Sequence, residues 1–426
     1  MKRTPAVTLV PALLAALLAA GPPPAAAAEI SLESRTYLPA SEDGAGNSHV
    51  TGYEYLDLGV ENAGMPGLYL RAGGWGRADL ADETYDNKTN SELQYGFLGY
   101  RAAHSNAEGR LGRISVTAGA ARNEVLDGLQ LGTDFAAGLK ALVYGGVPVE
   151  TDEGGRSGDS IWGGRLAQGL PGRYEAGVSY LREENDSETA REEAAFDLWL
   201  RPGLPLVLLG NSLYNVDTSA FARHDWRILT DPLLGGSRLV VRYSSTEYDD
   251  FFTSPGVTAF LAPLIEPGER LQRYGADLEI PLAAGFGLTA DYTAYRYDVA
   301  PSADRYGARV AWQRGTLGTG FAYHRSSGNE SVQSYDEYTG DVSFRLGPAQ
   351  LALGAQELRY EHAINGARDS LTLFAAADTA LSASLSVGAD VEYQSSPTYD
   401  SRVRGMLKLV WRYAHDTRAG QGGAAK

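Results

Sequence analysis

The segment Ser384–Tyr393 reads SLSVGADVEY and decides how the whole chain is interpreted. From Leu385 to Tyr393, apolar or aromatic residues occupy every second position, and the positions between them hold Ser, Gly, Asp and Glu. Successive side chains of a β-strand point to opposite faces of its sheet. The pattern therefore predicts a strand with one apolar and one polar face.

The same alternation recurs along much of the chain. Arg305–Gln313 (RYGARVAWQ) and Val403–Tyr413 (VRGMLKLVWRY) are two further examples. No segment shows convincing helical spacing. After residue 28, no run reaches the roughly 20 apolar residues that a membrane-spanning helix requires. The sequence therefore predicts an all-β protein.

The connections between the predicted strands alternate in length from residue 169 onward. Short ones such as Pro202–Pro205 and Gly315–Thr316 alternate with longer polar ones such as Glu183–Glu192, Glu247–Arg270, Glu361–Asp369 and Gln394–Asp400. Short turns on one rim and long loops on the other are typical of a transmembrane β-barrel. A secreted β-sandwich or β-solenoid is the structural alternative, but it predicts no such difference between two rims.

A barrel with both ends at one rim needs an even number of strands. A direct count gives an odd number of predicted strands. The number becomes even if Asp127–Leu131 is a short strand that turns at Thr133–Gly138 into Leu139–Val147. We therefore predict a single antiparallel up-and-down barrel of about 22 strands, with about 20 as the close alternative.

The first residues are typical of a secretory signal peptide. Lys2 and Arg3 precede the apolar stretch Ala6–Ala20, and Ala26–Ala28 provides an A-x-A cleavage site. We expect residues 1–28 to be a cleaved signal peptide and residues 29–413 to form the barrel. Residues 414–426, rich in Gly and Ala, are expected to be a flexible periplasmic tail.

Composition excludes several classes of function. The chain has 53 acidic and 37 basic residues, a net charge of −16, which argues against a nucleic-acid partner. It has no cysteine, which removes thiol nucleophiles, thiolate metal sites and covalently attached haem. The six histidines lack metal-ligand spacing, so we expect no metal and no cofactor of its own.

Tyrosine is abundant, with 25 residues, and many lie at the ends of predicted strands. Tyr243, Tyr323, Tyr338 and Tyr393 are examples. Amphipathic aromatic rings prefer the headgroup level of a bilayer, so this placement predicts aromatic girdles on a membrane-embedded barrel.

With these features the chain resembles the outer-membrane porin-like barrels of Gram-negative bacteria. The resemblance rests on the signal peptide, the alternating strands, the unequal rims and the last strand Val403–Tyr413, with Trp411 and Tyr413. Members of this class usually end on an aromatic residue, whereas this chain continues to Lys426. The resemblance implies an outer-membrane location, contact with outer-membrane lipid, and insertion by the outer-membrane assembly machinery.

Two functions stay open at this point. The first is a porin-like channel for passive passage of small polar solutes or ions. A barrel of this size without an N-terminal plug also resembles the barrel partner of porin–cytochrome conduits. There, the barrel sheathes a multihaem cytochrome that carries electrons and supplies the only haem. The sequence does not predict an enzyme. The only local pair of the kind that hydrolases use is His324 beside Ser326 or Ser327.

If the apolar set faces lipid, the alternate set faces the lumen, where charges need water or ionic partners. Arginines of two neighbouring strands are expected to form a basic stripe, and the acidic residues of the next strands to lie on the opposite wall. The stripe comprises Arg223, Arg227, Arg238 and Arg242, and the acidic group Asp277, Glu279 and Asp291. The other predicted pore-lining residues are Arg305, Arg309, Asp341, Arg345, Asp390, Glu392, Arg404, Lys408 and Arg412.

The longest predicted loop, Glu247–Arg270, holds many apolar groups that water would not solvate well. Either it folds into the barrel as a constriction, or it packs on a partner at the rim. We favour the constriction, with Asp249, Asp250, Phe251 and Phe252 as its residues.

Overall fold

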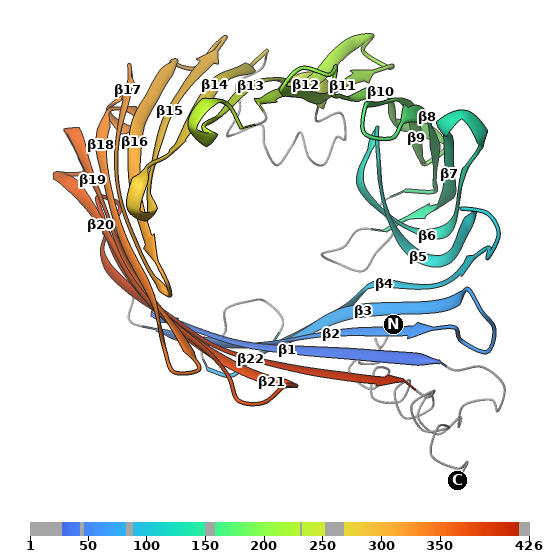
Figure 1. Ribbon diagram of the computed structural model, residues 1–426, viewed down its shortest axis with the longest axis horizontal. Coiled ribbons are helices and arrows are strands. Elements are labelled where there is room, and N and C mark those ends of the chain that lie inside the picture. Colours follow the sequence, from blue (N-terminus) through green and yellow to red (C-terminus); the bar gives the residue numbers. More distant parts are fainter. Residues whose placement is uncertain are drawn as a thin grey trace.

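The computed structural model describes residues 28–42, 47–81, 88–149, 158–230, 232–251 and 268–416. Its strands form one 22-stranded antiparallel sheet, and β1 pairs with β22 as well as with β2 (Figure 1). The predicted all-β closed barrel and its strand number are therefore confirmed. The strands are β1 (Glu29–Glu42), β2 (Ser48–Glu61), β3 (Leu68–Asp79), β4 (Thr89–Arg101), β5 (Glu108–Ala118), β6 (Ala121–Asp134), β7 (Leu139–Pro148), β8 (Ser160–Leu170), β9 (Tyr174–Asn185), β10 (Glu188–Leu200), β11 (Leu206–Asn215), β12 (Ala220–Thr230), β13 (Arg238–Glu247), β14 (Arg270–Pro281), β15 (Phe286–Tyr297), β16 (Ala303–Arg314), β17 (Leu317–Gly328), β18 (Tyr335–Leu346), β19 (Ala349–Ile364), β20 (Ala367–Ala380), β21 (Leu385–Ser396) and β22 (Tyr399–Asp416).

Closure depends on the pairing of the first and last strands. Their register runs from Glu29 opposite Asp416 to Ser41 opposite Arg404, so the two ends lie at the same rim. A closed sheet has no strand edge with unpaired backbone groups, which a bilayer does not tolerate. The last strand extends to Asp416, three residues beyond the predicted barrel end at 413. Residues 1–27, which carry most of the predicted signal peptide, lie outside the described residues.

The two rims differ, but less than the sequence predicts. The connections after even-numbered strands, here called the short-turn rim, are all short. The connections after odd-numbered strands, the long-loop rim, include residues 248–269. However, the predicted loop Glu183–Glu192 is mostly strand, with a tight turn at Asp186 and Ser187, both of positive φ. Such a turn suits the twist of a hairpin, so β9 and β10 stay paired beyond the expected strand ends.

Two further predicted loops are also mostly strand. Residues 361–369 and 394–400 turn only at residues 365–366 and 397–398. Polar residues in these hairpins keep strand conformation, because pairing depends on main-chain hydrogen bonds rather than on side-chain polarity. The ladders do shift register there, between Arg359 and Ile364 and between Gln394 and Ser396. Composition alone therefore overestimates the loops at this rim.

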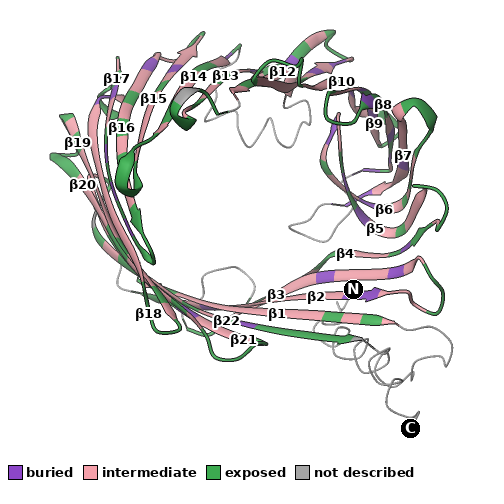
Figure 2. Ribbon diagram, in the orientation of Figure 1, coloured by how far each residue is buried: buried purple, intermediate pink, exposed green. Residues whose placement is uncertain are grey.

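The outer face of the barrel is apolar and exposed, the reverse of a soluble protein. Val178, Phe321 and Leu407 are each 56% exposed on this face, and most of the wall is intermediate or exposed (Figure 2). No helix within the described residues has the length and apolarity to cross a bilayer.

Aromatic pairs mark two levels on the outer face. Nearer the long-loop rim, Tyr243 packs on Tyr274 at a ring-centroid distance of 5.2 Å, and Tyr323 packs on Tyr338 at 5.3 Å. Nearer the short-turn rim, Phe286 packs on Trp312 at 6.1 Å, and Trp411 packs on Tyr413 at 6.2 Å. Two such bands above and below an apolar zone are typical of outer-membrane barrels.

The region around β6 departs most from the prediction. The expected short strand Asp127–Leu131 is part of β6, whose bounds are Ala121–Asp134. The expected turn is present, with a 3-10 turn, η2, at Ala136–Gly138 before β7. The additional residues of β6 build a hairpin with β5 that leaves the barrel wall.

Candidate functional site

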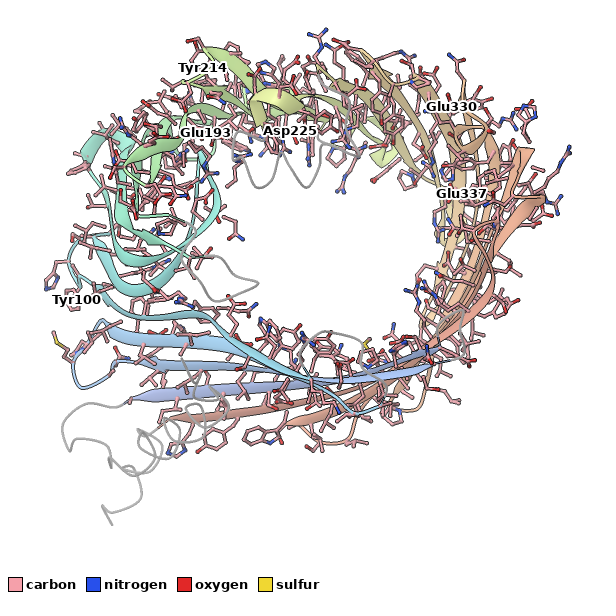
Figure 3. All side chains as sticks on the ribbon, turned by 180° about the vertical axis from the view of Figure 1, so that it is seen from behind. Tyr100, Glu193, Tyr214, Asp225, Glu330 and Glu337 are labelled. Carbon is pink, nitrogen blue, oxygen red and sulfur yellow. The ribbon has the colours of Figure 1, made fainter. Side chains whose placement is uncertain are left out.

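The inner face of the barrel is the candidate site. Glu193, Asp225 and Glu337 point toward the lumen, whereas Tyr100 and Tyr214 point outward (Figure 3). Directly paired residues of neighbouring strands share a face. The register from Asp225 onward therefore places every predicted pore-lining residue on the inner face.

The basic stripe and the acidic group lie side by side, so their predicted placement on opposite walls is wrong. Arg238 is directly opposite Glu279 across the β13–β14 ladder, and Arg242 forms an ion pair with Asp277. An up-and-down barrel places consecutive strands next to each other, so residues on β13 and β14 cannot face each other across the lumen.

Acidic partners neutralise most of the basic stripe. Asp225 lies 3.3 Å from both Arg223 and Arg227 on its own strand. Arg227 and Arg242 are directly opposite each other, and each forms an ion pair with a carboxylate, Arg227 with Asp225 and Arg242 with Asp277. Like charges on neighbouring strands repel, so these carboxylates stabilise that pairing.

A second network joins β15 to β18. Arg305 lies 2.9 Å from Glu337 and 3.4 Å from Asp291. His324 Nε2 lies 2.9 Å from the same Asp291, so this histidine belongs to the inner wall. On the same strands Arg309 pairs with Asp341 at 2.5 Å.

The remaining predicted residues fall into two groups. Two arginines of β22 are paired, Arg404 with Glu392, and Arg412 with Glu33 of β1 at 2.6 Å. The others form no ion pair with any residue in the described part of the chain, so water screens their charges. They are Arg238, Glu279, Arg345, Asp390 and Lys408.

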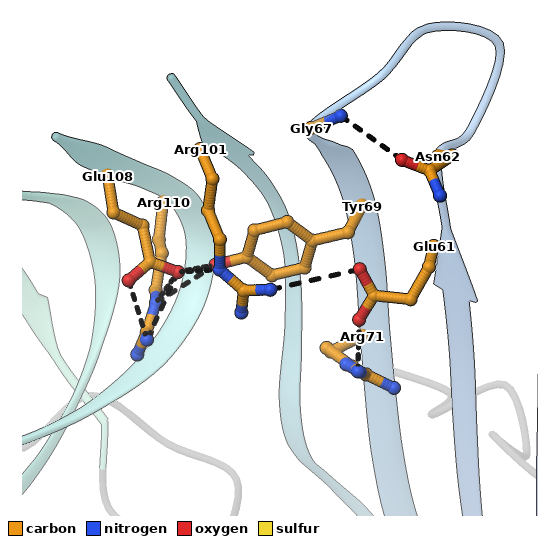
Figure 4. Close-up of polar contacts among 8 residues, drawn as sticks. All are labelled: Glu61, Asn62, Gly67, Tyr69, Arg71, Arg101, Glu108 and Arg110. Carbon is orange, nitrogen blue, oxygen red and sulfur yellow. Dashed lines mark hydrogen bonds and ion pairs between the residues drawn. The ribbon is translucent and has the colours of Figure 1, made fainter. Parts of the chain in front are cut away.

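The inner wall of β2 to β5 was not predicted from the sequence, although it is equally charged. Arg101 bridges Glu61 at 3.9 Å and Glu108 at 3.3 Å (Figure 4). Glu108 also accepts a hydrogen bond from Tyr69 and lies 3.2 Å from Arg110. The alternation of Glu108 and Arg110 with Gly109 and Leu111 is the sequence signal that could have identified this wall.

An inward fold on one side of the lumen was likewise not predicted from the sequence. β5 pairs with β4 only from Glu108 to Arg113, and its remainder curls inward with β6. The hairpin tip reaches β9, where the backbone N–H of Ala120 donates to Ser179 Oγ at 2.8 Å. We call this inward-folded part of the β5–β6 hairpin, residues 114–125, the lobe.

The lobe encloses the most deeply buried residues among those described. The face of the lobe that is turned toward the wall packs on the lumen-facing side chains of β7 to β12. Apolar side chains from the lobe and the wall therefore pack closely against each other. The cluster comprises Ile114, Val116, Ala120, Ala121, Leu126, Tyr144, Ile161, Leu181, Ala195, Leu213 and Ala222.

Ion pairs fix the lobe to the wall behind it. Arg122 lies 2.8 Å from Glu193, whose side chain is fully buried. Glu124 lies 2.9 Å from Arg191, which also contacts Glu183 at 3.3 Å. Alternation predicts that these groups face inward, but it does not predict that two inner faces meet.

The first residues of the predicted constriction loop lie against the lobe. They form the short helix α2 (Tyr248–Phe251), and the Phe251 ring packs on the buried cluster with Arg122 Cζ 4.3 Å from its centroid. Asn215 Nδ2 donates to the Asp250 carbonyl oxygen at 2.9 Å. Asp249 accepts from the backbone N–H of Gly268. Phe252 lies outside the described residues.

The described residues contain no group of three or more His, Asp or Glu side chains placed to hold a metal ion. The described inner wall is thus a set of paired and unpaired charges, and the lobe and α2 pack on the part of it formed by β7 to β12.

No family model matches the chain, and no curated protein matches it. Among solved structures it is similar to a chain of an E. coli P pilus tip assembly intermediate, PapC-PapD-PapK-PapG, at 11% identity and a TM-score of 0.55. That match covers 90% of this chain and 60% of the other.

Two other similar structures are matched over nearly the whole length of their chains. The P pilus usher (PapC) translocation pore matches at 10% identity and a TM-score of 0.49, covering 90% of this chain and 99% of the other. OccK5 (OpdH) of Pseudomonas aeruginosa matches at 11% identity and a TM-score of 0.41, covering 91% and 98%. At these identities the likeness concerns the fold alone: the chain has the fold of an outer-membrane β-barrel.

Proposed function

We propose that this chain forms a water-filled pore for small polar solutes and ions across the outer membrane. The observation that carries the proposal is the contrast between the two faces of a closed barrel. The outer face presents exposed apolar side chains between two aromatic bands, and the inner face presents charged side chains. Charges at membrane depth are stable where they line water or pair with one another.

The pore is narrowed by the lobe and by α2. Both lie on the inner face of β7 to β12, and the buried cluster holds them there. The unpaired charges of both signs, such as Arg238 and Glu279, lie outside this cluster. A lumen lined by both signs of charge favours weak rather than strong ion selectivity.

The test is conductance of the purified chain in a planar lipid bilayer. We expect discrete steps that grow in proportion to salt concentration, with a reversal potential near zero under a salt gradient. A folded barrel that inserts but gives no steps contradicts the proposal. A denatured sample of the same preparation is the control for leakage through detergent.

The sheath for a multihaem cytochrome remains the alternative, and its test is separate. Purification from native membranes under mild detergent would then recover a haem-containing partner in a fixed ratio to the barrel. No observation on the inner wall favours this alternative, and the lobe occupies space that a lumen-filling partner would need.

A further inference from the structure

A pocket of about 350 Å³ lies on the wall where β22, β1 and β2 run side by side (Figure 1). It is lined by Arg35, Tyr37, Pro39, Tyr53, Tyr55 and Met406. We propose that this pocket binds one ring of a neutral sugar in the lumen. The proposal names a solute class for the pore proposed above and rests on that function.

The strand register places the whole lining of the pocket on the inner face. Lys408, whose side chain is on the inner face, is directly opposite Tyr37, and Tyr37 is directly opposite Tyr53. Residues two positions apart on a strand share a face. The rest of the lining lies two positions from one of these three residues and therefore also faces the lumen: Arg35, Pro39, Tyr55 and Met406. None of the lining belongs to the buried cluster behind the lobe.

Two tyrosine rings form an aromatic corner in this pocket. The rings of Tyr37 and Tyr55 have centroids 5.7 Å apart and planes at 85°, so the edge of one ring meets the face of the other. Small-molecule sites are lined mainly by apolar and aromatic groups, with a few polar groups that fix the orientation of the ligand. A sugar ring has C–H groups on its faces, and these suit the negative face of an aromatic ring.

The hydroxyls of the two tyrosines are available to a solute. Both side chains are partly exposed, and neither hydroxyl has a hydrogen-bond partner in the described part of the chain. In contrast, the hydroxyl of Tyr95 on β4 donates to Asp57. A phenol hydroxyl both donates and accepts hydrogen bonds, as a sugar hydroxyl does. Tyr37 and Tyr55 therefore supply polar groups as well as an aromatic surface.

The cation that lines the pocket is already neutralised. Arg35 forms ion pairs with Asp57 and with Glu33, the second at 3.2 Å. Glu33 also pairs with Arg412 at 2.6 Å. Because these four charges balance, Arg35 does not give the pocket an excess of positive charge that would concentrate anions.

Charges of both signs also border the pocket on each side. On β22 and β21, Lys408 and Asp390 are directly opposite lining residues and form no ion pair with any residue that the structure describes. On β3, Arg77 is directly opposite Tyr53, and Asp79 follows on the same face. Each side thus has one positive and one negative residue, which offer donors and acceptors to hydroxyls. A neutral ring with hydroxyls at its edge suits this border better than an anion or a cation does.

The test is isothermal titration of the full-length barrel in detergent with maltotriose, a neutral sugar. We expect saturable binding that is about tenfold weaker in Tyr37→Ala/Tyr55→Ala, because this variant loses both aromatic surfaces and both hydroxyls. Tyr37→Phe/Tyr55→Phe keeps the rings and should show a smaller loss. Sorbitol, an open-chain polyol without a ring face, should not compete.

Tyr243→Ala/Tyr274→Ala is the matched control, because these two packed tyrosines lie on the outer face. It should bind maltotriose as the wild type does. Equal binding by the wild type and Tyr37→Ala/Tyr55→Ala overturns the proposal, as does an equal loss in the control. Tighter binding of benzoate, an aromatic anion, than of maltotriose also overturns it.

The heat-dependent shift in gel mobility shows whether each variant is folded. If the alanine variant does not fold, the phenylalanine variant decides, and wild-type affinity in that variant overturns the proposal. Titration does not depend on conductance. A conducting barrel that binds no maltotriose refutes the sugar site but not the pore, whereas a barrel that binds maltotriose without conducting refutes the pore.

Discussion

At the scale of single residues, the inner wall is organised by pairing rather than by clusters of one sign. Nearly every charge in the networks described has a partner of opposite sign on the same strand or a neighbouring one, as for Arg305 between Asp291 and Glu337. Where such pairs meet water, each contributes only about 0–1 kcal/mol. Their main effect is therefore on the local field in the lumen.

Changing Asp277 to Asn should shift ion selectivity toward anions. It removes the partner of Arg242, which lies directly opposite Arg227, and leaves excess positive charge at that level. The measurement is the reversal potential of single channels under a salt gradient. Asp304→Asn is the control, since Asp304 pairs with Arg296 on the outer face. Equal shifts in both variants would contradict the assignment of faces.

Replacing Glu193 with Ala should destabilise the barrel strongly. Glu193 is fully buried, and its loss leaves the largely buried Arg122 without its partner. Breaking a buried pair in this way costs about 3–5 kcal/mol. Urea unfolding in lipid vesicles measures this loss. Glu361→Ala, whose carboxylate is 51% exposed beside Arg325, should change the free energy of unfolding by about 1 kcal/mol or less.

At the scale of elements, the lobe is the feature that makes this barrel differ from a plain cylinder. It forms because β5 stops pairing with β4 beyond Arg113, where Arg113 donates instead to the Leu93 carbonyl oxygen at 2.8 Å. The same guanidinium forms two hydrogen bonds with Asp127, at 2.9 and 3.0 Å. This side chain therefore holds the point at which the hairpin leaves the wall.

Displacing the tip of the lobe should enlarge the pore. Gly119 has a φ of +60°, and a Cβ there would collide with Ser179 Oγ. Gly119→Val should therefore push the tip off β9 and raise the single-channel conductance. Gly64→Val is the matched control, because Gly64 also has a positive φ but has no atom near the position that a Cβ would take. If conductance is unchanged in Gly119→Val while the barrel stays folded, the lobe does not limit passage.

At the scale of the whole molecule, closure by β1 and β22 is the condition for a stable barrel. Their ladder runs without interruption from Glu29 to Ser41 on β1, and the outer face of β22 carries Trp411 and Tyr413. Without this ladder, two strands would present unpaired N–H and C=O groups to lipid, each at a cost of several kcal/mol.

Removing residues 399–426 should abolish folding. The truncated chain lacks β22 and so loses the pairings of both β1 and β21. The measurement is the heat-dependent shift in gel mobility that distinguishes a folded barrel from an unfolded chain. A truncation that removes only residues 417–426 should fold, because it leaves every described strand intact. A folded band from the larger truncation would contradict closure by β22.

The fold class, the even number of strands and the face of each predicted pore-lining residue between Arg223 and Arg412 could be predicted from the sequence. These properties follow from a period of two along each strand and from the difference between the rims. Even the turn at Thr133–Gly138 could be placed, because the residues there break the alternation.

Which inner faces line the lumen and which pack on each other depends on the tertiary arrangement of the strands. Alternation gives Ile114, Leu126 and Leu181 an inward direction, but it carries no information on how far a hairpin bends into the lumen. Likewise, the pairing of Arg242 with Asp277 depends on strand order and register, which are set by backbone hydrogen bonds between strands. The lobe follows from contacts between distant segments, and no local pattern predicts it.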